Sequence, residues 1–92
     1  MKLSVIIDRV EIREEVLEFA AYMESVLRKN DWKGGWKQDS IESLFDKMKE
    51  EVKEVEVAIK EKTPFHSDDL QKEVADVANF AMMIFNNNKY KK

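Results

Sequence analysis

The feature that most limits the fold of this chain is its shortage of turn-forming residues. Among 92 residues there are only two glycines, the adjacent Gly34 and Gly35, and a single proline, Pro64. A fold made of many short strands needs such residues at most of its tight turns, so the sequence argues against an all-β fold. A chain of this length has room for one hydrophobic core. We therefore predict a single all-α domain over residues 1–92.

The first predicted helix begins near Arg9 and ends near Lys29. Asp8 followed by Glu11 has the spacing of an N-terminal capping box, which places the helix start directly after Asp8. Apolar residues then recur at helical spacing and predict one buried face: Ile12, Val16, Phe19, Ala20, Met23, Val26 and Leu27.

Two further helices are expected after a loop over residues 30–38. One begins at Asp39 or Ser40 and runs to about residue 62, where Pro64 ends it, and its apolar stripe is Ile41, Leu44, Phe45, Met48, Val52, Val55 and Ile59. The other spans about residues 69–86 and is apolar on nearly every side. The other two helices cannot cover such a helix on every side, so we expect a second copy of the chain to complete the core.

The two ends of the chain are expected to lie outside this helical bundle. Residues 1–8 form an N-terminal arm, in which the run LSVII at 3–7 fits a strand, an extended segment or the approach to the first helix. Residues 87–92 are polar and basic, and we expect them to form a flexible tail.

Several classes of function are poorly compatible with this composition. The chain has no cysteine and one histidine, His66, which excludes cysteine nucleophiles and Cys-ligated metal sites. Its formal charge of -3 gives no field that would draw it onto nucleic acid. The apolar runs are far shorter than the roughly 20 residues that cross a membrane. We therefore expect a cytoplasmic protein that binds neither nucleic acid nor membranes.

Two pairs of carboxylates are the residues best suited to chemistry. Glu51 and Glu54 share a strip beside the apolar stripe of the second helix, and Glu73 and Asp76 repeat this spacing among apolar residues of the third. A carboxylate beside a core loses hydration, so it needs a partner, a metal ion or a proton. Oxygen ligands without His or Cys suit Mg²⁺, with Mn²⁺ as a substitute. Taken alone, the first pair fits solvated surface better, because the same helix carries several other glutamates.

Other residues near these pairs have both a functional and a structural interpretation. Asn79 either contacts a ligand or fills an interface between helices. Trp32 and Trp36 either stack on a base or close the end of the bundle. Lys33 and Lys37 either meet phosphate or remain solvated.

Taken in order, these motifs resemble the MazG-like branch of the all-α nucleoside triphosphate pyrophosphohydrolases. The family pattern is ExxE, a spacer and ExxD, and here it reads Glu51-Val-Lys-Glu54, eighteen residues, then Glu73-Val-Ala-Asp76. The sequence DWKGGW ahead of the second helix is also similar to a loop of small phage and prokaryotic members. The resemblance covers about residues 15–87.

The resemblance implies hydrolysis of a nucleoside triphosphate to the monophosphate and pyrophosphate. Mg²⁺ would be held by all four carboxylates, and Glu51 or Glu54 would also activate the attacking water. The implied substrate-binding residues are Lys33, Trp36, Lys37, Lys47 and Asn79. Similar small members are homodimers or homotetramers, and the spacing does not indicate which base is read. The main alternative is a non-enzymatic oligomeric helical module for binding or regulation, whose acidic strip is plain surface.

Overall fold

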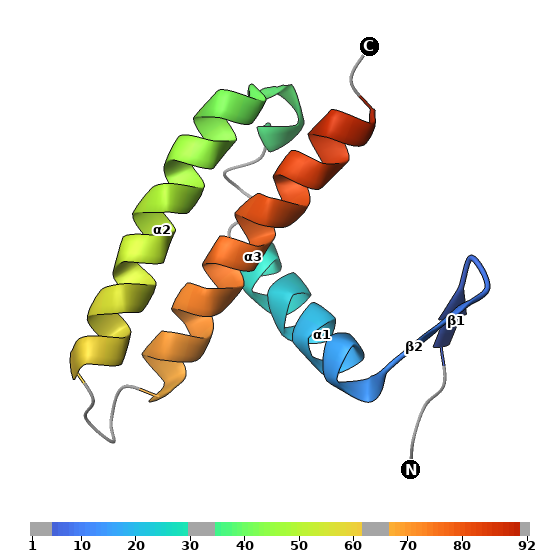
Figure 1. Cartoon of the computed structure of the whole chain (residues 1–92), viewed down its shortest axis with the longest axis horizontal. Helices are drawn as coiled ribbons and strands as arrows, with labels where there is room; N and C mark the ends of the chain where they lie inside the picture. The colour runs from blue at the N-terminus through green and yellow to red at the C-terminus, as the bar shows by residue number, and fades with distance from the viewer. Residues whose placement is uncertain (1–4, 30–34, 62–66, 91–92) are drawn as a thin grey trace.

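Three helices packed together make up most of the molecule, which confirms the predicted all-α bundle. The computed structural model describes residues 5–29, 35–61 and 67–90. Along the chain it contains β1 (Val5–Ile7), β2 (Val10–Ile12), α1 (Glu14–Lys29), the 3-10 helix η2 (Trp36–Gln38), α2 (Ile41–Glu61) and α3 (Ser67–Lys89). Figure 1 shows α2 and α3 side by side, with α1 crossing behind α3.

The N-terminal segment folds as a β-hairpin, so the predicted helix start at Arg9 is wrong. β1 pairs antiparallel with β2, and Ile7 lies opposite Val10. Asp8 and Arg9 form the turn with φ values of 51° and 67°. Two positive φ values in a two-residue connection match the right-handed twist of a hairpin. Asp8 is therefore a turn residue, and α1 begins five residues after Arg9, at Glu14.

α2 begins where the sequence predicted, because Ser40 caps it. The backbone N–H of Ser43 donates a hydrogen bond to Oγ of Ser40 at 3.1 Å, and the N–H of Leu44 donates to the Ser40 carbonyl at 3.0 Å. Leu44 is fully buried, and the other core residues are Val26 of α1 and Ala75 and Met83 of α3. The core therefore lies along α3, which contacts both other helices.

α3 is longer than predicted at both ends, starting at Ser67 and ending at Lys89. Residues 87–89 are thus helical and do not belong to a flexible tail. Asn87 accounts for this extension, because its side-chain amide donates hydrogen bonds to the carbonyls of Trp36 at 2.9 Å and Asp39 at 3.1 Å. These bonds fix η2, within the predicted loop, to the end of α3. Within the described segments, no helix is long and apolar enough to cross a membrane.

Candidate metal centre

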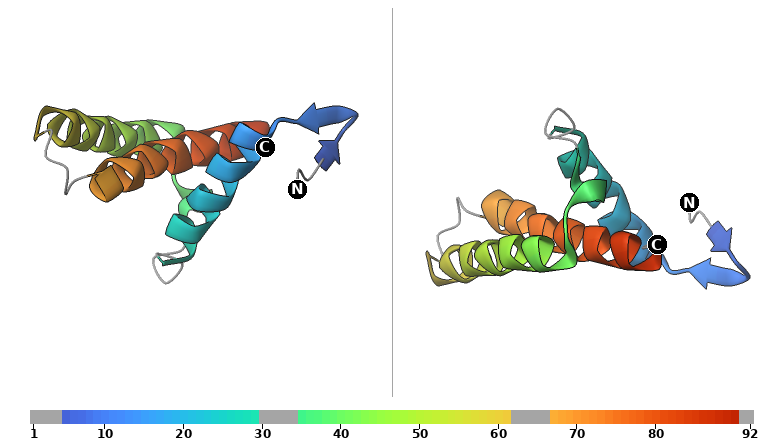
Figure 2. Two further views of the ribbon diagram at one scale, coloured as in Figure 1. Left: turned by 90° about the horizontal axis from the view of Figure 1, so that it is seen from below. Right: turned by 90° about the horizontal axis from the view of Figure 1, so that it is seen from above.

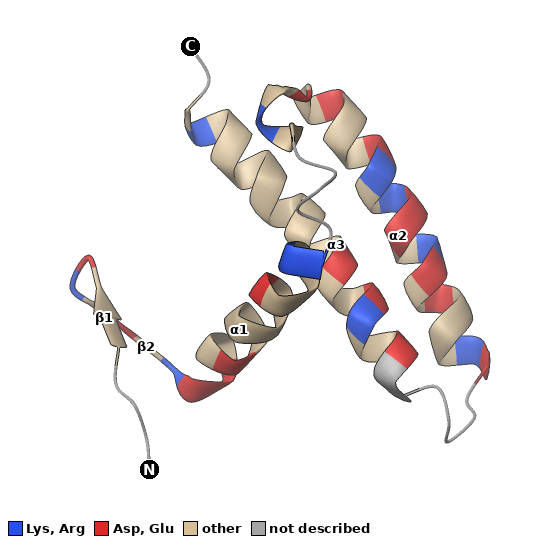
Figure 3. Cartoon of the chain, turned by 180° about the vertical axis from the view of Figure 1, so that it is seen from behind, with Lys and Arg blue, Asp and Glu red and all other residues tan. Residues whose placement is uncertain are grey.

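Three of the four predicted carboxylates meet between α2 and α3. Glu51 lies in the middle of α2, and Glu73 and Asp76 lie in the first half of α3. One oxygen from each carboxylate lies within 4.8 Å of the other two, and all three residues are half-buried. We call these three residues the carboxylate cluster. Figure 3 shows the charged residues gathered along α2 and the first half of α3, while most of the second half of α3 is uncharged.

The helical spacing explains why these side chains converge. Glu73 and Asp76 are three residues apart, so both project from one side of α3 within about one turn. α3 runs beside α2, and the same side of α3 therefore faces Glu51. Side-chain exposure is 21% for Glu73 and 16% for Asp76, so neither carboxylate is fully hydrated. The packing of α2 on α3 thus concentrates negative charge at a partly desolvated site.

The cost of this concentration appears at Glu51, whose pKa is raised above its usual value. Burial is the largest cause, because it removes water from the charged form. The charges of Asp76 and Glu73 raise the pKa further, as does a hydrogen bond with Glu73, whereas the charge of Lys72 opposes the shift. A cation among the three carboxylates would relieve the same repulsion.

Lys72 already supplies one positive charge to the carboxylate cluster, although it was not among the residues predicted for the site. Its Nζ donates a hydrogen bond to Oδ2 of Asp76 at 3.0 Å and lies 3.8 Å from Oε1 of Glu73. The hydrogen bond to Asp76 is the main reason that the pKa of Lys72 is raised. The sequence did contain a signal for this ion pair, because Lys72 and Asp76 are four residues apart on one helix and such side chains are neighbours. Its side chain is 55% exposed, which leaves it room to move.

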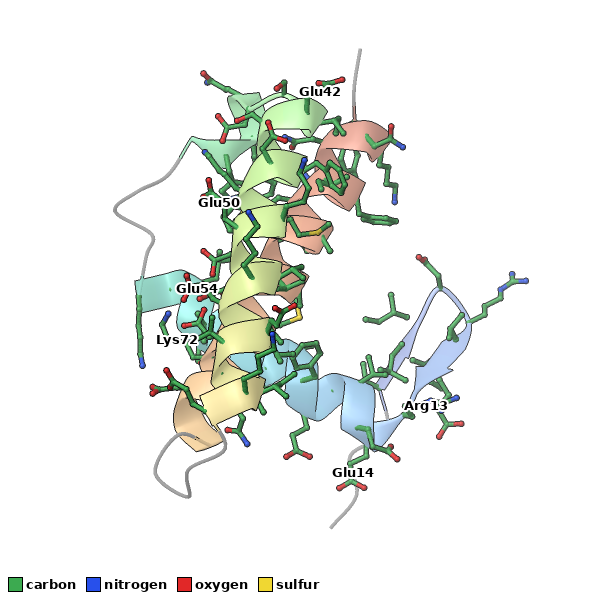
Figure 4. The ribbon with its side chains drawn as sticks, turned by 60° about the vertical axis from the view of Figure 1, so that its left-hand side comes forward. Arg13, Glu14, Glu42, Glu50, Glu54 and Lys72 are labelled. Atoms are coloured by element: carbon green, nitrogen blue, oxygen red, sulfur yellow. The ribbon has the colours of Figure 1, made fainter. Side chains whose placement is uncertain are left out.

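Glu54 is the one predicted ligand that does not join the cluster. It lies three residues after Glu51 on α2 and is exposed. Figure 4 shows Glu54 on the same side of the α2–α3 pair as Lys72. Its carboxylate is therefore in contact with solvent and is not one of the three that converge.

Two of the predicted substrate-binding residues that the structure describes, Asn79 and Lys47, have partners outside the carboxylate cluster. Asn79 is buried, and its side-chain amide donates a hydrogen bond to the Met23 carbonyl at 3.2 Å. It therefore joins α3 to α1, which was the structural interpretation of this residue. Lys47 forms an ion pair with Asp39 at 3.3 Å.

Trp36 and Lys37 lie in η2, just before the first residue of α2. Lys37 Nζ is 5.8 Å from the centre of the Trp36 ring. From the start of α2 to Glu51 is ten residues, or about 15 Å of helix. Lys37 lines a separate hollow of about 600 Å³ formed with the start of α2 and the end of α3. Lys33, Trp32 and His66 lie outside the described residues.

Searches against protein-family models, curated proteins and solved structures found no match to this chain. The interpretation of the carboxylate cluster therefore depends on its own residues and geometry.

The raised pKa of Glu51 predicts how metal-free stability depends on pH. In the folded state Glu51 holds its proton more tightly than in the unfolded state, where its pKa is near 4.5. Its contribution to the free energy of unfolding therefore falls as pH rises from that value through the folded pKa. We expect Glu51→Gln to remove this loss and to raise stability at pH 7 in EDTA, measured by urea unfolding between pH 4 and 8.

Glu50→Gln is the matched control, because Glu50 is an exposed carboxylate on the same helix. It should leave the pH dependence of unfolding as in the wild type. Equal pH profiles for wild type and Glu51→Gln would contradict this account of the cluster.

Proposed function

We propose that this chain is a Mg²⁺-dependent nucleoside triphosphate pyrophosphohydrolase. The observation that carries the proposal is the convergence of Glu51, Glu73 and Asp76, which come from two different helices. Like charges gather in this way at a cost of free energy, and sites with that cost are frequently functional. The same three residues belong to the ExxE and ExxD motifs that resemble those of the MazG-like enzymes.

The donor set of the carboxylate cluster fits Mg²⁺. Mg²⁺ prefers oxygen ligands and keeps several waters, so two or three carboxylates and a bound phosphate satisfy it. We assign metal binding to Glu51, Glu73 and Asp76, with Mn²⁺ as a substitute metal. When bound, the ion would neutralise the triphosphate, polarise the attacked phosphorus and lower the pKa of a bound water.

The remaining charged residues at the site have separate roles in this proposal. Glu54 accepts the proton of the attacking water, because it lies three residues after Glu51 on α2, contacts solvent and is not one of the three converging ligands. Lys72 balances the cluster before substrate binds. Its exposed side chain then turns towards the phosphates, where a lysine acts as a point charge. Lys33, Trp36, Lys37 and Lys47 remain predictions for substrate contacts.

A non-enzymatic helical module is the second candidate function. The observation that favours it is the ion pair of Lys72 with Asp76, which satisfies part of the cluster without any metal. The two candidates differ in what Mg²⁺ should do to thermal stability. A ligand that binds only the folded state stabilises it, whereas plain surface carboxylates give no such linkage.

We expect Mg²⁺ at millimolar concentration to raise the melting temperature of the wild type relative to EDTA. Glu73→Gln should lose this increase, because it removes one of the three charges that hold the ion. The measurement is thermal unfolding followed by circular dichroism at 222 nm. Glu42→Gln, at an exposed carboxylate in the first turn of α2, should keep the wild-type increase. An equal response to Mg²⁺ in wild type and Glu73→Gln would favour the non-enzymatic module.

A further inference from the structure

Lys72 is a cation that the chain itself places against the carboxylate cluster. Its Nζ donates a hydrogen bond to Oδ2 of Asp76 at 3.0 Å and lies 3.8 Å from Oε1 of Glu73. Figure 2 shows from two directions that α2 and α3 lie side by side while α1 projects away from them. The charge of Lys72 also acts across this pair of helices: burial and the neighbouring carboxylates raise the pKa of Glu51, and Lys72 opposes that rise. One ammonium group thus acts on all three carboxylates.

Lys72 and a metal ion would draw on the same negative charges. Lys72 compensates the charge of one of the three carboxylates, and its ammonium group would repel a divalent cation among them. A charge within about 4–6 Å changes the proton affinity of a group by roughly 10- to 1,000-fold. Mg²⁺ carries twice the charge of a proton, so a nearby ammonium group should weaken its binding by at least the lower of these factors. Lys72 in its observed position therefore opposes metal binding.

The side chain of Lys72 can leave the carboxylate cluster at little cost. It is 55% exposed, whereas the side chains of Glu73 and Asp76 are 21% and 16% exposed. Ion pairs of a solvent-exposed lysine contribute little to stability, because water replaces the partner. The four-carbon stem of lysine is flexible, and its ammonium group pairs with phosphate oxygens as a point charge. A bound triphosphate would therefore offer Lys72 a second set of partners.

We propose that Lys72 is an exchangeable counterion, which competes with free Mg²⁺ for the carboxylate cluster and transfers to the phosphates when a triphosphate binds together with its metal ion. The cluster then binds the metal–triphosphate complex in preference to the metal alone, because only the complex gives Lys72 a new partner. This inference rests on the metal binding of the proposed function, but it does not depend on which phosphate bond is hydrolysed.

The first test is the affinity for Mg²⁺ alone, measured by isothermal titration calorimetry at pH 8, where protons compete little with the metal. Lys72→Met should bind Mg²⁺ at least about 10-fold more tightly than the wild type. Lys72→Arg keeps the charge and should bind it as weakly as the wild type. Lys60→Met is the matched control, because Lys60 forms an ion pair of the same length, 3.0 Å, with Glu56 four residues away, and both side chains are exposed. It should not change the affinity.

The second test uses inorganic tripolyphosphate with Mg²⁺ in excess, a probe that has the three phosphates of the substrate but no base. Lys72→Met should bind this complex about 10-fold more weakly than the wild type, because it loses one charge-assisted hydrogen bond to phosphate. Lys72→Arg should bind it as the wild type does. Lys72→Met thus changes the two affinities in opposite directions. A lysine that only stabilises α3 would change them in the same direction or leave both unchanged.

Each test can overturn one half of the inference. Unchanged or weaker Mg²⁺ binding by Lys72→Met would overturn the competition between lysine and metal. Unchanged or tighter binding of the tripolyphosphate complex by this variant would overturn the transfer to phosphate. If both expected changes are seen but no nucleoside triphosphate is hydrolysed, the inference stands and the proposed reaction is wrong. If the wild type and all three variants bind no Mg²⁺, the metal centre of the proposed function is wrong and the inference is overturned with it.

Discussion

Asp76→Asn should reduce hydrolysis of nucleoside triphosphates by at least about 100-fold, because it removes one of the three charges that would hold the proposed metal ion. Asp76 is the less exposed of the two cluster carboxylates on α3, and it lies closer to Lys72 than Glu73 does. Asparagine keeps nearly the same size, so the packing between α2 and α3 should survive. The measurement is the rate of pyrophosphate release with Mg²⁺, together with the helical circular dichroism of the variant. Glu73→Gln should behave in the same way.

The control for this prediction is Asp46→Asn. Asp46 forms an ion pair with Lys49 on α2, and its side chain is 72% exposed. Its replacement therefore measures the effect of removing a carboxylate of α2 that is not part of the carboxylate cluster. We expect wild-type activity from it. A folded Asp76→Asn variant with near wild-type activity would show that the carboxylate cluster is not the catalytic metal centre.

Leu44→Ala should have the largest effect on folding, lowering the free energy of unfolding by about 2–5 kcal/mol. Leu44 is the one large side chain among the described residues that is fully buried, and it lies in the first turn of α2, close to the Ser40 cap. Truncation removes buried methyl groups and leaves a cavity that the helices close only in part. Such a loss is a large share of the roughly 5–15 kcal/mol that stabilises a small domain. The measurement is urea unfolding at a fixed protein concentration.

Val57→Ala provides the comparison for Leu44→Ala. Val57 is on the same helix but half exposed, and alanine has the better helix propensity, so the change should be within about 0.5 kcal/mol. Equal effects of the two substitutions would contradict the assignment of Leu44 to the core. Both variants are measured at the same protein concentration, because the stability of any protein that self-associates depends on concentration.

The helices were predictable because their apolar residues follow the helical repeat. For α2 the spacing of Asp39 and Glu42 and the position of Pro64 gave both ends to within a residue or two. The end of α3 was not predictable from local sequence, since the run of asparagines suggested a tail. Asn87 instead finds backbone carbonyls in η2 and the residue after it, a contact nearly fifty residues away in the chain. A contact between segments so far apart leaves no signal in the local sequence.

The N-terminal hairpin was missed because the same residues satisfy two local patterns. Asp8 with Glu11 has capping-box spacing, but Asp8 also adopts positive φ more readily than most residues. The flanking residues are β-branched, which favours strands, and they pair across the turn. Strand pairing therefore decided the outcome, and the helix began only at Glu14.

The candidate site was predictable in its carboxylates but not in its surroundings. The motif spacing identified Glu51, Glu73 and Asp76, and the packing of α2 on α3 brings them together. Spacing along one helix could not show that Glu54 would lie outside the cluster, or that Lys72 would lie against it. Asn79 was recognised as unusual on an apolar helix, yet its partner is a carbonyl of α1. The partner of a polar side chain depends on which neighbouring helix packs against it.

The most direct test of the proposed function is an assay of all eight common ribo- and deoxyribonucleoside triphosphates, with Mg²⁺ and with EDTA. Pyrophosphate and orthophosphate are measured separately. The proposal predicts the monophosphate and pyrophosphate in equal amounts from at least one substrate, with no product in EDTA. Release of orthophosphate without pyrophosphate, activity that persists in EDTA, or no hydrolysis of any of the eight would contradict it.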